Sequence, residues 1–388
     1  MDGGTNHGRR HGRGRFVNPI EIGSTSPEPS LSGSSAKWRG IDFWSAFGPY
    51  LGLSVVLLLF CYFTWQRGDL NRFLSVSNFK LITVHTTITA TVALGMTMIM
   101  ISGGIDLSVG YVVSLVTVTM MLTYRLAFEQ PWRQLFHHHF EFDIPYSDFL
   151  AQSPSVWAIV AGLLTGGFTG LANGMLITRL KVVPFVVTLG MMGVARGLAR
   201  YLTKGTPIVF PESAQPPRWV PALGAIEPDP PWLGVGPSVW SVLLLAVVVA
   251  AILRFTVLGR YCFALGSNEA TARLCGINVE RTKVILYTLA GLLTAWAGIL
   301  QFARSRAGLH DVQAGLELDV IAAVVIGGGS LTGGEGTVTG TLVGALMITV
   351  LSNGCSKLDL PMEFRFVIIG MIIIGVSAVN TWRQRRLT

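Results

Sequence analysis

The chain has 388 residues, of which 51% are hydrophobic and 13% are charged, whereas soluble domains carry about 25% charged residues. This balance excludes an ordinary soluble domain. The net charge of +8 could indicate a nucleic-acid partner, but the positive residues lie at the edges of apolar blocks and near both termini, as membrane topology requires. The apolar blocks are continuous rather than alternating, which excludes a membrane β-barrel. We therefore expect an all-α polytopic membrane protein that contacts the lipid bilayer and binds no nucleic acid.

The N-terminal region carries no structural signal of its own. Residues 1–45 are rich in Gly, Ser, Arg and Pro, which predicts a disordered cytoplasmic tail. Arg9 and Arg10 are not followed by the apolar core that an export signal needs. The four cysteines of the chain are dispersed, without disulfide or metal-ligand spacing. We expect them to be reduced, and we expect the chain to bind no metal and no cofactor.

The transmembrane domain is expected over 46–382. A helix needs about 20 apolar residues to cross the hydrocarbon core. Continuous apolar blocks of this length lie at 46–65, 81–101, 109–128, 156–178, 183–202, 239–257 and 284–302. An interrupted, glycine-rich pair follows at 319–326 and 336–351, and a last block lies at 364–379. If the interrupted pair contributes two crossings, the domain has about ten transmembrane helices.

Basic residues set the orientation of these crossings. Arginines are clustered before the first block and in the tail 383–388, and segments rich in Lys and Arg stay in the cytoplasm. Both termini are therefore expected inside the cell, which an even number of crossings satisfies. The same count places 258–283 in the cytoplasm and the long loops 128–155 and 205–237 in the periplasm. Three adjacent histidines, 137–139, have no spacing that would hold one metal ion.

The segment 102–110 reads SGGIDLSVG and joins two apolar blocks. Gly103 and Gly104 allow backbone turns that are closed to other residues, and Asp106 or Ser108 can cap the following helix. A tight turn with a helix cap is the structural interpretation. An ionisable residue at the junction of two membrane segments is otherwise a candidate functional residue. Both interpretations stay open at this point.

Glycines recur at intervals of four in two blocks, and this spacing lets another helix backbone approach closely. The first stripe leads into Asn173 and consists of Gly162, Gly166, Gly170 and Gly174. The second consists of Gly336, Gly340 and Gly344. It follows Asp319 and a glycine cluster that includes Gly333 and Gly334. Interrupted helices of this kind are tolerated only inside protein or beside a water-filled cavity.

A polar island between two apolar blocks, 259–283, reads GRYCFALGSNEATARLCGINVERTK. Ser267 or Asn268 can N-cap a short helix, Glu269 suits its positive N-terminal end, and Gly276 suits its exit. At helical spacing one face of this helix would carry Ala270, Thr271, Leu274 and Cys275. The island is either a structured loop without a partner or a docking helix for a cytoplasmic subunit.

These blocks resemble, in the same order, the permeases of ABC importers for monosaccharides of the ribose, xylose, arabinose and galactose type. The resemblance covers 80–380, and GGIDLSVG is its most specific part. In the island the matching residues are Gly266, Asn268, Ala272, Arg273, Gly276 and Ile277. Thr271 stands where many relatives have alanine. In that family this loop carries the coupling helix, which lies in a groove of the ATPase.

The resemblance implies a non-catalytic transport subunit of the bacterial inner membrane. A separate cytoplasmic ABC ATPase would use ATP and Mg²⁺, a periplasmic binding protein would deliver the sugar, and a second permease copy would complete a homodimer. It assigns ATPase coupling to Gly266, Asn268, Glu269, Ala270, Ala272, Arg273, Leu274, Gly276 and Ile277. Signature or pathway candidates are Gly103, Gly104, Asp106, Ser108, Asn173, Asp319, Gly333 and Gly334.

Other functions are weighed against this one. The chain has no G-x-x-x-x-G-K-[ST] loop, so the sequence predicts no ATP-binding machinery of its own. A similar permease could carry branched-chain amino acids or another small polar solute. A secondary transporter could use Asp106, Asp319 or Glu335 as buried proton relays, but the docking island argues against it. A membrane enzyme is disfavoured, because the sequence shows no nucleophile, base or metal cluster at catalytic spacing.

Overall fold

The computed structural model describes residues 43–129, 146–210, 216–227, 234–361, 363–372 and 374–375. Within these ranges eight helices are long and apolar enough to cross a membrane. They are α1 (Phe43–Gln66), α3 (Val76–Ile101), α4 (Val109–Glu129), α6 (Tyr146–Leu180), α7 (Pro184–Thr203), α9 (Pro237–Phe255), α12 (Val279–Ser305) and α14 (Val338–Lys357). The predicted all-α polytopic membrane fold is confirmed.

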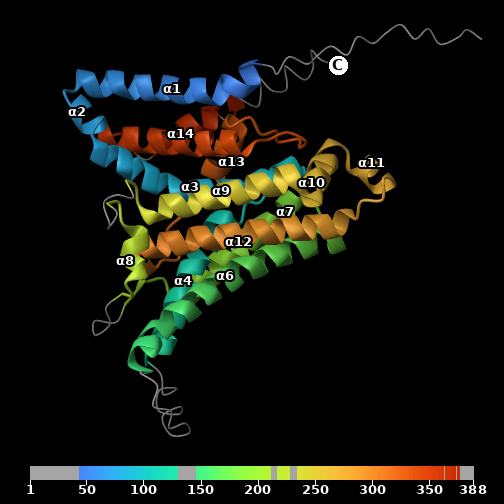
Figure 1. Cartoon of the computed structure of the whole chain (residues 1–388), viewed down its shortest axis with the longest axis horizontal. Coiled ribbons are helices and arrows are strands. Elements are labelled where there is room, and N and C mark those ends of the chain that lie inside the picture. Colours follow the sequence, from blue (N-terminus) through green and yellow to red (C-terminus); the bar gives the residue numbers. More distant parts are fainter. Residues whose placement is uncertain are drawn as a thin grey trace, which may run out of the picture. The chain divides into compact units, whose positions relative to one another are not determined.

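The long helices lie side by side in one bundle, in which α1, α14, α3, α9, α12 and α6 follow one another across the view of Figure 1. Shorter elements occupy the ends and the interior. They are α2 (Leu70–Phe73), α8 (Trp219–Gly224), α10 (Val257–Ser267), α11 (Glu269–Leu274), α13 (Leu316–Ile326) and the antiparallel strands β1 (Ile208–Val209) and β2 (Ala307–Gly308). In Figure 1, α11 and α8 lie at opposite ends of the bundle.

Helix α6 packs on α12 through the predicted glycine stripe. A Cβ atom added to Gly166 would lie 2.5 Å from the carbonyl oxygen of Gly291, and one on Gly174 would lie 2.8 Å from the Cα atom of Val284. A Cβ atom on Gly170 would overlap the carbonyl oxygen of Tyr287. Only glycine permits so close an approach of two helix backbones. The predicted role of this stripe in close packing is confirmed.

The second stripe packs α14 on the short helix α13. Side chains at Gly340 and Gly344 would overlap the carbonyl oxygens of Gly327 and Ala323, whereas Gly336 faces the side chain of Ile101. Because α13 has 11 residues, it is about 16 Å long, which is about half the thickness of a hydrocarbon core of about 30 Å. It is therefore too short to cross alone.

The structure adds a second interruption, which the sequence interpretation did not place. Before α13 the chain runs without helix from Arg306 to Gly315 beside α4. There the hydroxyl of Thr117 both accepts a hydrogen bond from the backbone N–H of Leu309 (3.1 Å) and donates one to its carbonyl oxygen (3.2 Å). Irregular backbone inside a membrane protein needs such internal partners. The helix of this pair is thus broken on both sides, not only at the glycine cluster 327–336.

Several helices extend beyond the apolar blocks that predicted them. Helix α3 begins at Val76 rather than at 81, because the hydroxyl of Ser75 caps it by accepting from the N–H of Asn78. Helices α4 and α6 extend into the predicted loop 128–155, and the three histidines lie outside the described residues. Polar residues can continue a helix beyond its apolar block, and hydropathy alone does not detect them.

The other predicted boundaries differ in the same way. The predicted loop 205–237 contains β1 and α8, and the predicted loop 258–283 consists mainly of α10, α11 and the start of α12. The last apolar block is helical at 363–372 and 374–375. The rest of that block, the tail 383–388 and nearly all of the tail 1–45 lie outside the described residues, so the count of ten crossings stays a prediction.

Candidate docking site at the end of the bundle

Helix α10 forms the first part of the polar island and packs it onto the bundle. The hydroxyl of Thr256 accepts from the backbone N–H of Gly259 and caps the helix. The thiol of Cys262 is buried and donates to the carbonyl oxygen of Met98 at 3.1 Å. The base of the island is therefore packed against α3 and α9 rather than being a free loop.

Helix α11 is capped at both ends. The side chain of Asn268, not that of Ser267, accepts from the N–H of Thr271 at 3.0 Å. Gly276 follows the helix with a φ of +81°, a left-handed conformation that favours glycine. The predicted short helix and its predicted exit residue are thus present in the structure.

The outer face of α11 is open. Ala272 is buried, while Leu274 is 89% exposed and Ile277 is half-buried. The residues predicted to share one face are all exposed: Ala270, Thr271, Leu274 and Cys275. The capped helix thus presents an exposed face outside the bundle, with Leu274 as its large apolar residue, and this face is the candidate docking surface.

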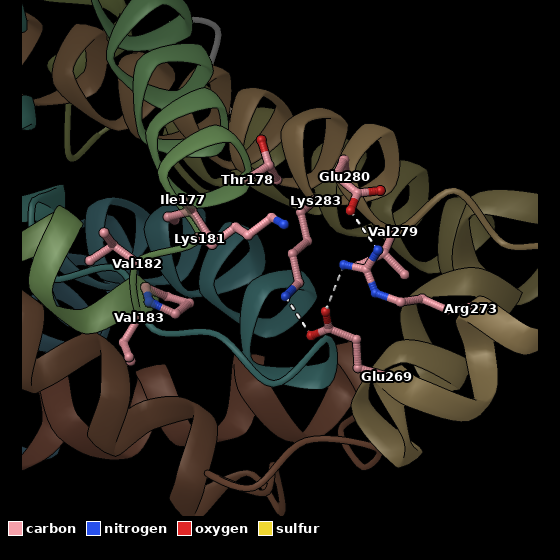
Figure 2. A pocket seen from close by; sticks show the side chains of 11 residues that line it. Ile177, Thr178, Lys181, Val182, Val183, Glu269, Arg273, Val279, Glu280 and Lys283 are labelled. Carbon is pink, nitrogen blue, oxygen red and sulfur yellow. Dashed lines mark hydrogen bonds and ion pairs between the residues drawn. The ribbon is translucent and has the colours of Figure 1, made fainter.

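Ion pairs connect α11 to the start of α12 (Figure 2). The guanidinium of Arg273 lies 2.5 Å from a carboxylate oxygen of Glu280 and 3.1 Å from one of Glu269. The ammonium of Lys283 lies 2.7 Å from the other carboxylate oxygen of Glu269. We call these four residues the charge cluster. The guanidinium of Arg273, a residue that the resemblance assigned to ATPase coupling, is thus already paired within the chain.

The charge cluster shifts the titration of its own members. Partial burial alone would raise the pKa of Glu269, but the hydrogen bond and charge of Lys283, followed by those of Arg273, lower it below its ordinary value. The hydrogen bond from Arg273 likewise lowers the pKa of Glu280. Both carboxylates are therefore charged at neutral pH, and the ion pairs persist there.

The charge cluster borders a cleft of about 340 Å³ between two parts of the chain. One wall is the end of α6 with the turn that leads into α7, and the other is formed by α11 and the first turns of α12. Lys181 lies in that turn with a φ of +52°, and Figure 2 shows its side chain extending toward Lys283 on the other wall. The turn at the end of α6 thus lies beside the island.

Candidate residues from three separate motifs meet at Gly266. A Cβ atom on Gly266 would overlap the carbonyl oxygen of Ile101 and the backbone nitrogen of Gly334, and these two atoms are joined by a hydrogen bond of 2.9 Å. A Cβ atom on Gly333 would lie 2.9 Å from the Cα atom of Gly266 and 3.1 Å from that of Gly103. The glycines are needed because the last turn of α10, the turn after α3 and the turn after α13 are in backbone contact here.

A second group of candidates forms a buried polar cluster. The carboxylate of Asp106 accepts from the backbone N–H (2.8 Å) and the hydroxyl (2.6 Å) of Ser108. The side-chain amide of Asn173 donates to the Ser108 hydroxyl at 3.1 Å and to Asp106 at 3.4 Å. Asp106 thus stabilises the turn before α4, and Gly104 lies in the same turn against the hydroxyl of Tyr287.

The remaining acidic candidates do not join this cluster. Asp319 is buried in α13 and pairs with the guanidinium of Arg365 in the last described helix. Glu335 is exposed in the turn before α14, so its prediction as a buried acid is wrong. The structure therefore separates the three acids that a proton-relay interpretation had grouped.

Sequence reasoning missed Glu280, Lys283 and Arg365 as functional candidates. The first two lie in α12, outside the short helix that drew attention, and their partners are up to 14 residues away in the chain. Arg365 could have been found as an isolated arginine within an apolar block, because a charge in such a place needs an internal partner.

Membrane-length helices with a capped, exposed helix outside the bundle define a polytopic membrane protein with a candidate docking surface. Comparisons with known proteins identify its family. The family model described as the permease component of branched-chain amino acid transport systems matches residues 78–377. The chain belongs to this family of transport permeases. No solved structure gives a significant match.

Three relatives illustrate the similarity. The chain is 33% identical to the ribose import permease protein RbsC of Escherichia coli, over 81% of this chain and 88% of the relative. It is 30% identical to the L-arabinose ABC transporter permease protein AraH of Azospirillum brasilense, over 93% of this chain and 96% of the relative. It is 36% identical to the probable ABC transporter permease protein YphD of Escherichia coli, over 94% and 98%.

Proposed function

We propose that this chain is the membrane-spanning permease subunit of an ATP-driven importer that translocates a monosaccharide. The observation that carries the proposal is the capped helix α11 with its exposed face, in a chain similar over most of its length to permeases named for ribose and arabinose. The family model is described by branched-chain amino acid transport. The named relatives favour sugar, because their similarity covers nearly the whole transmembrane region.

The energy would come from a separate cytoplasmic ATPase that binds ATP and Mg²⁺. The sequence contains no phosphate-binding loop, which supports a non-catalytic transport role for this chain. We assign ATPase docking to Ala270, Leu274 and the half-buried Ile277. Three other predicted coupling residues position α11. Asn268 caps it and Gly276 ends it, while Gly266 packs the end of the preceding helix α10.

A periplasmic binding protein would deliver the sugar, and a second copy of the permease would complete the pathway. Helix α7 supports the second copy. Its Gly190, Gly193 and Gly197 have open space where a side chain would be, and Arg196 and Arg200 are exposed on the same helix. Arginines are costly against lipid tails, so a protein or aqueous surface suits this helix better than lipid alone.

The proposed orientation places the α11 end of the bundle in the cytoplasm of a bacterial cell, in the inner membrane. The basic residues of the island and of the turn after α6 support it. In Figure 1 the described part of the chain begins at the same end as α11. Helix α8, which belongs to the predicted periplasmic loop 205–237, lies at the opposite end.

The experiment replaces Leu274 by glutamate, which would bury an unpaired charge in the proposed contact. We expect normal abundance of the permease in the membrane, loss of ATPase co-purification and loss of sugar uptake. The matched control, Ile226→Glu, places the same charge near α8 at the opposite end and should keep the ATPase bound. Normal co-purification with Leu274→Glu would show that α11 is not the docking site.

A proton-coupled secondary transporter is the second candidate. In liposomes that contain the purified chain alone, an imposed proton gradient should produce no sugar accumulation. Accumulation under this condition would overturn the ATP-driven proposal. The separation of Asp106, Asp319 and Glu335 in the structure supports the expected result.

A further inference from the structure

We propose that the charge cluster makes α11 and the first turns of α12 move as one body, so that Glu269 and Lys283 are positioning residues for energy coupling. This inference rests on the proposed function, because it concerns how a displacement of α11 by an ATPase would reach the transmembrane helices. It goes beyond docking, since neither carboxylate of the charge cluster belongs to the exposed apolar face.

Among the described residues, the charge cluster provides the polar side-chain contacts between α11 and other elements. It has six residues, of which only Ala272 is buried. In the part of the chain that the structure describes, every side-chain hydrogen bond or ion pair from α11 to another element ends on α12, at Glu280 or Lys283. Without these pairs, α11 would be held only by the packing of Ala272 and by the backbone that enters and leaves it.

Helix α12 contacts the turn that carries the buried polar cluster. Lys283 lies one helical turn before Tyr287, so both side chains lie on the same face of α12. The hydroxyl of Tyr287 lies 3.5 Å from the carbonyl oxygen of Ile105, in the turn that carries Asp106. The backbone of α12 from Val284 to Gly291 is in close contact with the glycine stripe of α6. A displacement of α12 is therefore delivered to α6 and to the 102–108 turn together.

The ion pairs of the charge cluster can serve coupling while contributing little to folding stability. The side chains of Glu269, Arg273 and Glu280 are 43–48% exposed, and that of Lys283 is 17% exposed. Ion pairs exposed to this degree contribute little to stability in water. A docked ATPase would exclude water from the island, and the same pairs would then attract more strongly because the local dielectric constant falls. The charge cluster is thus strongest when a force has to be transmitted.

The experiment measures sugar imported per ATP hydrolysed by the full complex in proteoliposomes. Glu269→Gln and Lys283→Met should each keep the ATPase bound and hydrolysing, while the ratio falls about tenfold, within the usual range of coupling between sites. The double variant should lose no more than Glu269→Gln alone, because that substitution already removes the pair with Lys283. Lys283→Arg keeps the charge and should restore the ratio.

The matched control is Arg281→Met. Arg281 is exposed on the same turn of α12, and its backbone N–H, not its side chain, makes its hydrogen bond to Asn278. The ratio should stay at the unmodified value. A fall as large as that of Lys283→Met would overturn the inference, because it would show a general need for positive charge.

Three other results overturn the inference in distinguishable ways. If the unmodified complex couples normally and both Glu269→Gln and Lys283→Met keep its ratio, the positioning role is wrong and the proposed function stands. If these variants release the ATPase, the charge cluster is a docking contact and not a transmission element. If the unmodified permease neither binds an ATPase nor imports sugar, the proposed function fails, and the inference fails with it.

Discussion

Helix α12 is held by α6 and by α11 in two physically different ways. Within the bundle, three glycines of α6 bring two backbones into direct contact. At the end of the bundle, the two helices α11 and α12 meet through charged side chains that remain partly exposed. The first contact is permanent packing, whereas the second depends on charge and solvent.

The difference follows from the surroundings of each contact. Lipid tails are as apolar as leucine, so helices within a membrane associate through close packing rather than through a hydrophobic driving force. Charged pairs there would lose their hydration. At the water-exposed end, ion pairs form without that cost and can be strengthened or weakened by what covers them. A transporter needs both kinds of contact, one to keep the bundle intact and one that responds to a partner.

The largest expected effect comes from breaking the packed contact. Gly170→Leu places a side chain where the backbone of Tyr287 lies, and overpacking of this kind costs about 3 kcal/mol or more. We expect loss of folded protein, measured as the yield of monodisperse permease in detergent and as its thermal unfolding midpoint. Gly48→Leu makes the same substitution at an open position of α1 and should leave both values unchanged. Equal losses in the two variants would contradict the contrast between partnered and open glycines.

A smaller effect should follow from loosening α11 without touching its charges. Asn268→Ala removes the N-cap, which costs about 1 kcal/mol. Hydrogen exchange of the α11 amides should become faster by a corresponding factor, while exchange in α6 and α12 stays unchanged. Unchanged exchange in α11 would mean that the ion pairs alone fix this helix.

The smallest effect should come from acid, and it should affect only the ionic contact. The pKa of Glu269 is lowered in the folded chain relative to its ordinary value of 4.5, so its pairs stabilise α11 above that pH and are lost as the pH falls through the lower folded value. A spin label on Cys275 should therefore keep the same mobility from pH 8 to pH 5 and gain mobility only below about 4.5. In Glu269→Gln the transition should be smaller, because only the pair between Arg273 and Glu280, whose pKa is also lowered, is then left to titrate. A transition near pH 6.5 would instead indicate a histidine.

The sequence predicted those features of the fold that depend on local spacing. Helix-length apolar blocks, the stripe that ends at Gly174, and a capped helix before Gly276 all follow from residues close together in the chain. The break before α13 was missed because the segment 306–315 has no signal that separates it from a loop. The contacts of Asn173 with Asp106, and of Lys283 with Glu269, join residues distant in sequence, and spacing rules carry no information on such pairs.

The junction at Gly266 limits how this protein can be re-engineered. Three turns fit together there without side chains, so the island is not a module that can be exchanged alone. A chimera that gives the permease the island of a relative, in order to recruit a different ATPase, would preserve this fit only if 101–104 and 327–336 were transferred with it. Under the proposed function, specificity for the energy-supplying partner is thereby tied to the two turns that follow α3 and α13.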